Sequence, residues 1–129
     1  MGLNVTLWVA AGMLAIVALT GGLIKLVVPK AKLAKQPGAQ WAGDASVGFV
    51  KLLGVLEILA AVGLILPGAV NIVPVLVPVT AVCWMLLMIC AMVAHLRYGE
   101  VKPIALNLIY LLLAAFIAWG RFGPESFPV

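Results

Sequence analysis

The sequence predicts an all-α protein, an integral membrane up-down bundle of four helices. Of 129 residues, 66% are apolar and 9% are charged, whereas soluble domains average roughly 45 to 50% apolar and about 25% charged residues. The apolar residues gather into four runs, each close to the ~20 residues that span the hydrocarbon core of a bilayer. Because no repeat or soluble linker separates these runs, we expect residues 1–129 to form a single transmembrane domain.

The boundaries of the four helices follow from proline. The first two helices are expected to end at Pro29 and Pro67, since proline removes a backbone donor and clashes with the preceding turn. Pro74 and Pro78 fall in the first turns of the third helix, where a missing N–H costs least. The fourth helix starts after Pro103 and is the shortest. The expected ranges are 5–28, 47–66, 72–96 and 104–119.

The basic residues predict the orientation. Very short turns make consecutive helices antiparallel neighbours, which places five basic residues on one side of the membrane and one on the other. The five are Lys30, Lys32, Lys35, Arg97 and Lys102, and the one is Arg121. The positive-inside rule then puts both basic loops in the cytoplasm and both termini outside the cell membrane. The first run lacks the basic n-region of a signal peptide, so we expect it to remain as a helix.

The net charge of +4 is explained by these loops, which can contact anionic lipid headgroups. No basic patch is interleaved with aromatic residues, so membrane lipids are expected as partners and nucleic acid is not.

The two cysteines, Cys83 and Cys90, are seven residues apart in one run, roughly 10 Å along a helix. A disulfide spans Cα atoms up to about 7 Å apart, so we expect two small buried thiols instead.

Polar side chains at membrane depth are the candidate functional residues. A charge at the bilayer centre costs about 2.5 to 3.5 kcal/mol on the insertion scale, so such residues face the bundle interior and mark a site. Glu57 lies roughly 16 Å from the start of its helix, near the midplane. Four others lie closer to the basic loops, which outlines a polar funnel with Glu57 at its floor. The four are Lys25, Lys51, His95 and Asn107.

Each candidate has a predicted role. The groups that would transfer a proton are Glu57, Lys51 and His95. Ligand-binding groups are expected on the first and fourth helices, and they are Lys25, Asn107 and Tyr110.

Structural explanations for the same residues remain open at this point. Lys25 can snorkel toward the headgroups, His95 can cap the third helix, and Asn107 can join two helices by a hydrogen bond. Glu57 can form a structural ion pair with Lys51 or Lys25. Other chemistries are excluded, because one His and two Cys on one helix do not have metal-ligand spacing. The sequence also has no phosphate loop, CxxC or nucleophile elbow, so no metal and no cofactor is expected.

Two stretches carry a resemblance to a known family. They are KLLGVLEILAAVGLILP at 51–67 and, within 94–124, AHLRYGE followed by NLIYLLLAAFIAWGRFGP. Together with GLIKL at 22–26, they resemble the DoxX-like family of small four-helix membrane proteins. The family name derives from a subunit associated with thiosulfate:quinone oxidoreduction, although this chain has no electron-transfer motif of its own. The architecture is also distantly similar to that of sterol isomerases, a similarity of fold alone.

The sequence leaves three functions to compare. The first is an intramembrane polar site that binds, or acts by proton transfer on, a lipophilic small molecule such as a quinone, an isoprenoid or a sterol-like lipid. The second is a non-catalytic subunit or scaffold of an oxidoreductase-type complex, whose partner is a membrane redox protein or a second copy. The third, a proton-coupled carrier, would need oligomerisation to form a path.

Overall fold

A computed structural model describes residues 2–128, which fold into helices and turns with no strand in that range. Four of the helices are long and apolar enough to cross a membrane, which confirms the all-α four-helix prediction. Two short helices lie between the first two spans. In chain order the helices are α1 (Gly2–Val27), α2 (Lys30–Leu33), α3 (Trp41–Asp44), α4 (Val47–Val70), α5 (Leu76–Arg97) and α6 (Val101–Phe122).

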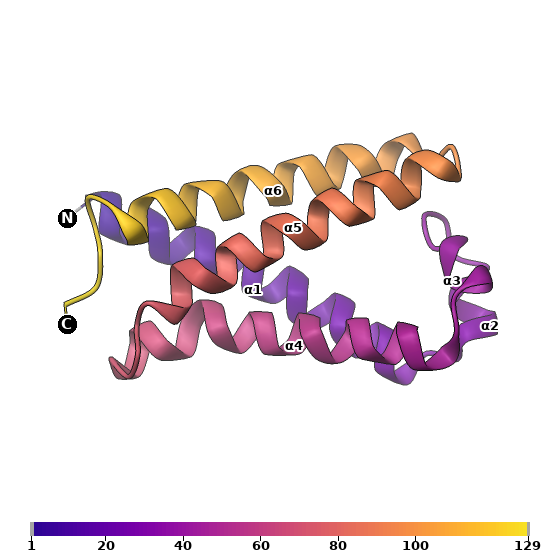
Figure 1. The fold of residues 1–129 in the computed structure, drawn as a ribbon, viewed down its shortest axis with the longest axis horizontal. Coiled ribbons are helices and arrows are strands. Elements are labelled where there is room, and N and C mark those ends of the chain that lie inside the picture. The colour runs from indigo at the N-terminus through magenta and orange to yellow at the C-terminus, as the bar shows by residue number, and fades with distance from the viewer. Residues whose placement is uncertain (1, 129) are drawn as a thin grey trace.

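The four long helices form two tightly packed pairs, α1 with α4 and α5 with α6 (Figure 1). Glycine allows the first pair to approach closely. A Cβ atom at Gly22 would lie 2.7 Å from the carbonyl oxygen of Gly54, and one at Gly54 would lie 2.9 Å from that of Gly22. Small residues of this kind are typical of packed transmembrane helices. Additional contacts of α4 with α5 and of α1 with α6 join the two pairs.

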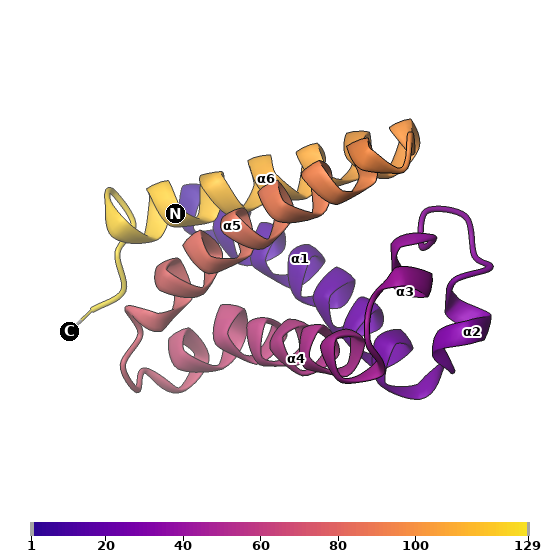
Figure 2. The ribbon, with the colours of Figure 1, turned by 45° about the vertical axis from the view of Figure 1, so that its right-hand side comes forward.

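The two pairs meet near the chain termini and diverge toward the opposite end. At the termini end, Gly63 of α4 packs against Thr80 of α5, and Gly120 of α6 packs against Leu7 of α1. From there α4 and α5 separate, and the segment that carries α2 and α3 lies at the open end (Figures 1 and 2). The termini end and the basic end are therefore packed very differently.

The connection between α1 and α4 is not the very short turn that was expected. It comprises residues 29–46, contains two short helices, and is called the α2–α3 segment below. Leu33 and Ala42 of this segment are buried together with Val50 at the start of α4. Gly38 has φ +81°, and a Cβ atom there would lie 2.8 Å from Cγ of Pro103 on α6. The segment therefore has a small core of its own and rests on the α6 side of the opening.

The turn between α4 and α5 differs from the predicted boundary. Helix α4 continues through Pro67 to Val70, because proline in the last turn removes only one of its hydrogen bonds. Asn71 then ends the helix with φ 54°, and the carbonyl of Pro67 accepts its backbone N–H. Val73 also has positive φ, 46°, so α5 begins at Leu76 rather than at residue 72.

The start of α1 and both ends of α6 were predicted too far inward. Helix α1 already begins at Gly2, and α6 runs from Val101 to Phe122. Pro103 lies within the first turn of α6, where the backbone N–H of an α-helix has no acceptor in any case. The fourth span is therefore as long as the third, 22 residues each.

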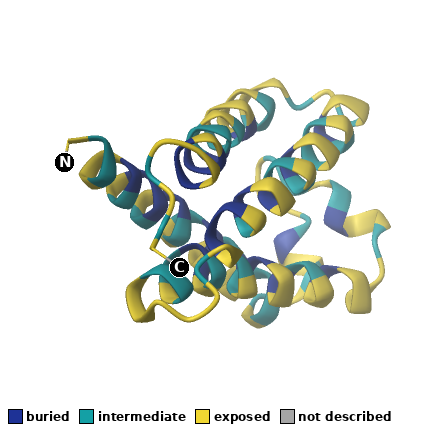
Figure 3. Cartoon of the chain, turned by 60° about the vertical axis from the view of Figure 1, so that its left-hand side comes forward, coloured by how far each residue is buried: buried dark blue, intermediate teal, exposed yellow. Residues whose placement is uncertain are grey.

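Burial follows the inner faces of the helices (Figure 3). Leu7, Leu14, Leu64 and Ile117 are fully buried in the core, and Trp84 is 2% exposed. The outer faces remain exposed and apolar. Examples are Ile16, Leu59, Leu86 and Leu112. This arrangement suits an apolar solvent, and the chain is a multi-pass membrane protein.

Candidate functional site

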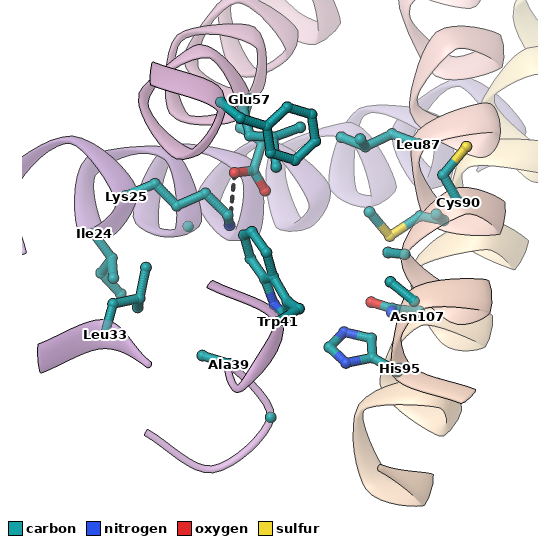
Figure 4. Close-up of a pocket in the computed structure, with 17 residues that line it drawn as sticks. Ile24, Lys25, Leu33, Ala39, Trp41, Glu57, Leu87, Cys90, His95 and Asn107 are labelled. Carbon is teal, nitrogen blue, oxygen red and sulfur yellow. Dashed lines mark ion pairs between the residues drawn. The ribbon is translucent and has the colours of Figure 1, made fainter. Parts of the chain in front are cut away.

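A cavity of about 340 Å³ lies where the two helix pairs diverge (Figure 4). Its volume falls within the roughly 300 to 1,000 Å³ that is typical of small-molecule sites. All four long helices and the α2–α3 segment contribute to its lining. Most of the wall is apolar, and four polar side chains face into it. These are Lys25 of α1, Glu57 of α4, His95 of α5 and Asn107 of α6.

Lys25 and Glu57 form an ion pair across the α1–α4 contact. The distance between Lys25 Nζ and Glu57 Oε2 is 2.8 Å, and the side chains are 19% and 10% exposed. Gly21 leaves room for the carboxylate, since a Cβ atom there would lie 3.2 Å from Glu57 Oε1. Lys25 Nζ also lies 5.9 Å from the centroid of the Trp41 ring, a distance typical of cation–π contacts. The ammonium therefore points into the cavity rather than toward the headgroups.

His95 is oriented by Glu100, which follows it around the end of α5. Its Nδ1 lies 2.9 Å from Glu100 Oε1, and the backbone N–H of Glu100 donates to the carbonyl oxygen of His95 at 3.0 Å. Where the Glu100 carboxylate accepts this hydrogen bond, Nδ1 is the donor. The other ring nitrogen, Nε2, is left to accept a hydrogen bond when the imidazole is neutral.

Asn107 brings an unpaired amide to the same cavity. It is 9% exposed, and its amide nitrogen has no hydrogen-bond partner within residues 2–128. A buried donor left without an acceptor costs about 1 to 3 kcal/mol. An oxygen atom on a bound molecule would remove that cost.

Lys51 and Tyr110 lie outside this cavity. Lys51 is exposed, and its Nζ donates to the backbone carbonyl of Leu26 at 3.0 Å, which caps the end of α1. Tyr110 is half-buried and packs against the main hydrophobic core. Of the two lysines considered as partners of Glu57, the structure thus selects Lys25.

Sequence reasoning missed three residues of the site, namely Gly21, Trp41 and Glu100. Trp41 lies in the loop that was interpreted from its lysines alone, although an interfacial tryptophan is a known anchor. Glu100 is five residues after His95, beyond the helix end, where spacing does not determine direction. Gly21 matters only because Glu57 lies against it.

The α2–α3 segment covers the basic end of the cavity. Its residues in the lining are Leu33, Gly38, Ala39 and Trp41. The hydroxyl of Tyr98, just after α5, donates to Asp44 Oδ2 of α3. This hydrogen bond raises the pKa of Tyr98, because it holds the phenolic proton. Lys30 Nζ donates to the carbonyl oxygen of Gly43 at 3.1 Å, which holds α2 to α3.

The cysteines are exposed, which corrects the prediction that they are buried. Cys83 and Cys90 both carry free thiols, so the prediction that they do not pair is confirmed. Cys90 also lines the cavity. Within residues 2–128, the cavity included, no group of three or more His, Cys, Asp or Glu side chains is arranged to hold a metal ion.

Four membrane-spanning helices around a small polar cavity define a compact multi-pass membrane protein. The model of the DoxX-like family matches residues 9–117, and the chain belongs to this family. The match confirms the resemblance seen in the sequence. Comparison with curated proteins and with solved structures gives no match.

Proposed function

We propose that this protein binds a lipophilic small molecule with a polar head inside the membrane and exchanges a proton with that head. Quinones, isoprenoids and sterol-like lipids are the candidate ligand classes. The proposal rests on one observation. Four polar side chains, one from each long helix, line the same apolar-walled cavity, and they are Lys25, Glu57, His95 and Asn107. Ionisable groups inside a membrane are costly and normally mark functional sites.

The four side chains offer complementary hydrogen bonds to such a head. The amide nitrogen of Asn107 and the ammonium of Lys25 can donate to a carbonyl or hydroxyl oxygen, whereas Glu57 and neutral His95 can accept from a hydroxyl. If a hydroxyl gives its proton to the Glu57 carboxylate, the resulting oxyanion can pair with Lys25 in place of Glu57. The charge of the pair is then conserved within the cavity, and Lys51 takes no part.

A second candidate function is a non-catalytic subunit or scaffold. The observation that favours it is the 2.8 Å contact of Lys25 with Glu57, because two charges that satisfy each other need no ligand. Removing one partner of a buried ion pair costs about 3 to 5 kcal/mol, whereas removing both is often nearly neutral. The two functions therefore predict different behaviour of single and double variants.

The experiment compares Glu57→Gln, Lys25→Met and their double variant, with Lys51→Met as the matched lysine control outside the cavity. Detergent-melting temperature measures folding, and native mass spectrometry with lipid extraction measures the co-purified ligand. If the cavity is a site, Glu57→Gln and the double variant lose the ligand while Lys51→Met keeps it. A double variant that regains stability and still holds its ligand would overturn the proposal and show that the ion pair of Lys25 with Glu57 is only structural.

We also propose that the end of the bundle covered by the α2–α3 segment faces the cytoplasm. The basic residues of the loops support this orientation through the positive-inside rule.

A further inference from the structure

Two apolar grooves adjoin the cavity along the gap between α4 and α5. The first, which we call the deep groove, has a volume of about 420 Å³ and runs between α4 and residues 79–90 of α5. Its lining is Leu56, Leu59, Ala60, Val79, Thr80, Cys83, Trp84, Leu86, Leu87 and Cys90. The second has a volume of about 520 Å³ and lies between α3 and the last half of α5.

The grooves adjoin the cavity and share lining residues with it. Leu87 and Cys90 line both the cavity and the deep groove, and Cys90 also lines the second groove. Both residues lie across the cavity from Glu57 (Figure 4), and the thiol of Cys90 is exposed. Cys90 thus lies where the cavity meets the lipid-facing side of the bundle, and a passage between the two would run beside it.

The packing of the helices leaves α4 and α5 apart at this side of the cavity. Gly63 and Thr80 close the α4–α5 contact near the termini, and the two helices separate from that point toward the basic end (Figure 2). The water-facing end of the cavity is instead covered by the α2–α3 segment, with Leu33, Gly38 and Trp41 in its lining. A molecule therefore reaches the cavity more directly from the bilayer than from water.

The deep groove also has the shape and chemistry for a chain. From Leu87 to Val79 it follows nine residues of α5, whose eight steps cover about 12 Å at 1.5 Å per residue. Its side chains are apolar apart from the hydroxyl of Thr80, the indole N–H of Trp84 and the two thiols, so it offers no site for a charged head.

We infer that the ligand is a chain-bearing amphiphile, which holds its head in the cavity and passes its chain beside Leu87 and Cys90 into the deep groove. This inference rests on the proposed function and narrows it to molecules with a long flexible acyl or isoprenoid chain. A compact ring system without a chain would leave the deep groove to bulk lipid.

The test is photolabelling of the full chain in lipid nanodiscs with hexadecanol that carries a diazirine near its chain end and an alkyne tag. Labelled positions are mapped by peptide mass spectrometry, with and without excess unlabelled hexadecanol. We expect labelling at the half-buried residues of the groove, Ala60, Thr80 and Leu87, that the competitor reduces at least severalfold. Labelling of the outer face of α6, for example at Leu112, should not respond to the competitor.

Two variants then test the passage. Cys90→Trp fills it and should abolish the competed labelling, whereas Leu112→Trp adds the same bulk on the outer face of α6 and should leave it intact. Labelling of the deep groove that the competitor does not reduce would identify ordinary lipid and overturn the inference. Equal loss in both variants would overturn it as well. Competed labelling of the unsubstituted protein tests the inference even if the Cys90→Trp variant does not fold.

The same variants separate this inference from the proposed function. Competed labelling of the groove that is unchanged in the Glu57→Gln/Lys25→Met double variant would support the chain groove and contradict the polar site. Loss of the co-purified ligand in that double variant, without competed labelling of the groove, would support the polar site and overturn the chain groove.

Discussion

The glycine contact between α1 and α4 sets the register of the ion pair. Lys25 is three residues after Gly22, and Glu57 is three residues after Gly54. Because α1 and α4 are antiparallel, Lys25 lies beside Gly54, with its Cβ 3.1 Å from the Cβ position there, and the Glu57 carboxylate lies beside Gly21. The close approach of the two backbones lets the long lysine side chain span this offset and reach the carboxylate. The 2.8 Å contact of Lys25 with Glu57 therefore depends on two residues that carry no side chain.

Replacement of Gly22 tests this dependence. Gly22→Ala places a methyl group 2.7 Å from the Gly54 carbonyl, and we expect a loss of about 1 to 3 kcal/mol in the free energy of unfolding, as for an overpacked core. Gly12→Ala is the matched control, because no heavy atom lies within 4 Å of its Cβ position. That control should change stability by less than about 1 kcal/mol. Equal effects in a detergent unfolding titration would contradict the argument.

Arg121 has a structural role that its sequence position does not reveal. It is 5% exposed, donates to Asn4 Oδ1 at 2.8 Å and to the carbonyl oxygen of Glu125 at 2.9 Å. Its guanidinium carbon also lies 4.0 Å from the centroid of the Phe127 ring. One side chain thereby ties α6 to α1 and to the C-terminal residues.

Arg121→Met should destabilise the termini end of the bundle. Hydrogen bonds to charged groups contribute about 1.5 to 3 kcal/mol, and we expect a loss in that range. A double-mutant cycle with Asn4→Ala, followed by detergent melting, isolates the contact between the two side chains. Strictly additive effects of the two substitutions would show that this hydrogen bond does not contribute.

At the scale of whole elements, the α2–α3 segment is the main difference between this protein and a simple four-helix bundle. The segment covers the cavity because α4 and α5 diverge, and its position is fixed by Gly38 against Pro103 and by Asp44 with Tyr98. These contacts join parts of the chain that lie far apart in the sequence.

The contact of Tyr98 with Asp44 predicts a pH dependence. Because the hydrogen bond raises the pKa of Tyr98, the phenol should ionise above the usual value of about 10. The contact then stabilises the fold while Tyr98 is protonated, and the benefit is lost as the pH rises through the raised pKa. An absorbance titration of tyrosinate, with Tyr98→Phe as the reference, should show this step. Asp44→Ala should move the step to lower pH, and an unchanged step would contradict the contact.

The sequence predicted the four spans well, because each depends on the summed hydropathy of about twenty residues and tolerates local errors. Boundaries at Pro67 and Pro103 were less accurate, because proline in the last or first turn of a helix costs little and does not mark its end. The choice of Lys25 over Lys51 as the partner of Glu57 could not be read from the sequence, because both lysines lie near the basic ends of their helices and only the α1–α4 contact distinguishes them.

The fold of the α2–α3 segment could not be predicted for a different reason. Its two helices have four residues each, too few for a periodic pattern. Isolated helices of this length are unstable in water and form only when tertiary packing supports them. Here the support comes from the divergence of two helix pairs, which is a property of the whole molecule.

At the scale of the whole molecule, charge is distributed unequally between the two ends. The only basic side chain expected at the termini end, Arg121, is buried and engaged by Asn4 and Glu125. At the other end, Lys32, Lys35, Arg97 and Lys102 are exposed. Burial of Arg121 thus leaves the basic end with the exposed positive charge, which strengthens the argument for a cytoplasmic location.

Cysteine labelling in intact cells tests this orientation. Gln36→Cys and Lys102→Cys lie at the basic end and should be protected from a membrane-impermeant thiol reagent, whereas Ser126→Cys at the termini end should react. All three positions are exposed, so protection reports the side of the membrane rather than burial in the protein. Cys83 and Cys90 are first replaced by Ser, because both native thiols are exposed. Labelling of Gln36→Cys and Lys102→Cys, with Ser126→Cys protected, would reverse the topology and place the covered end of the cavity outside the cell.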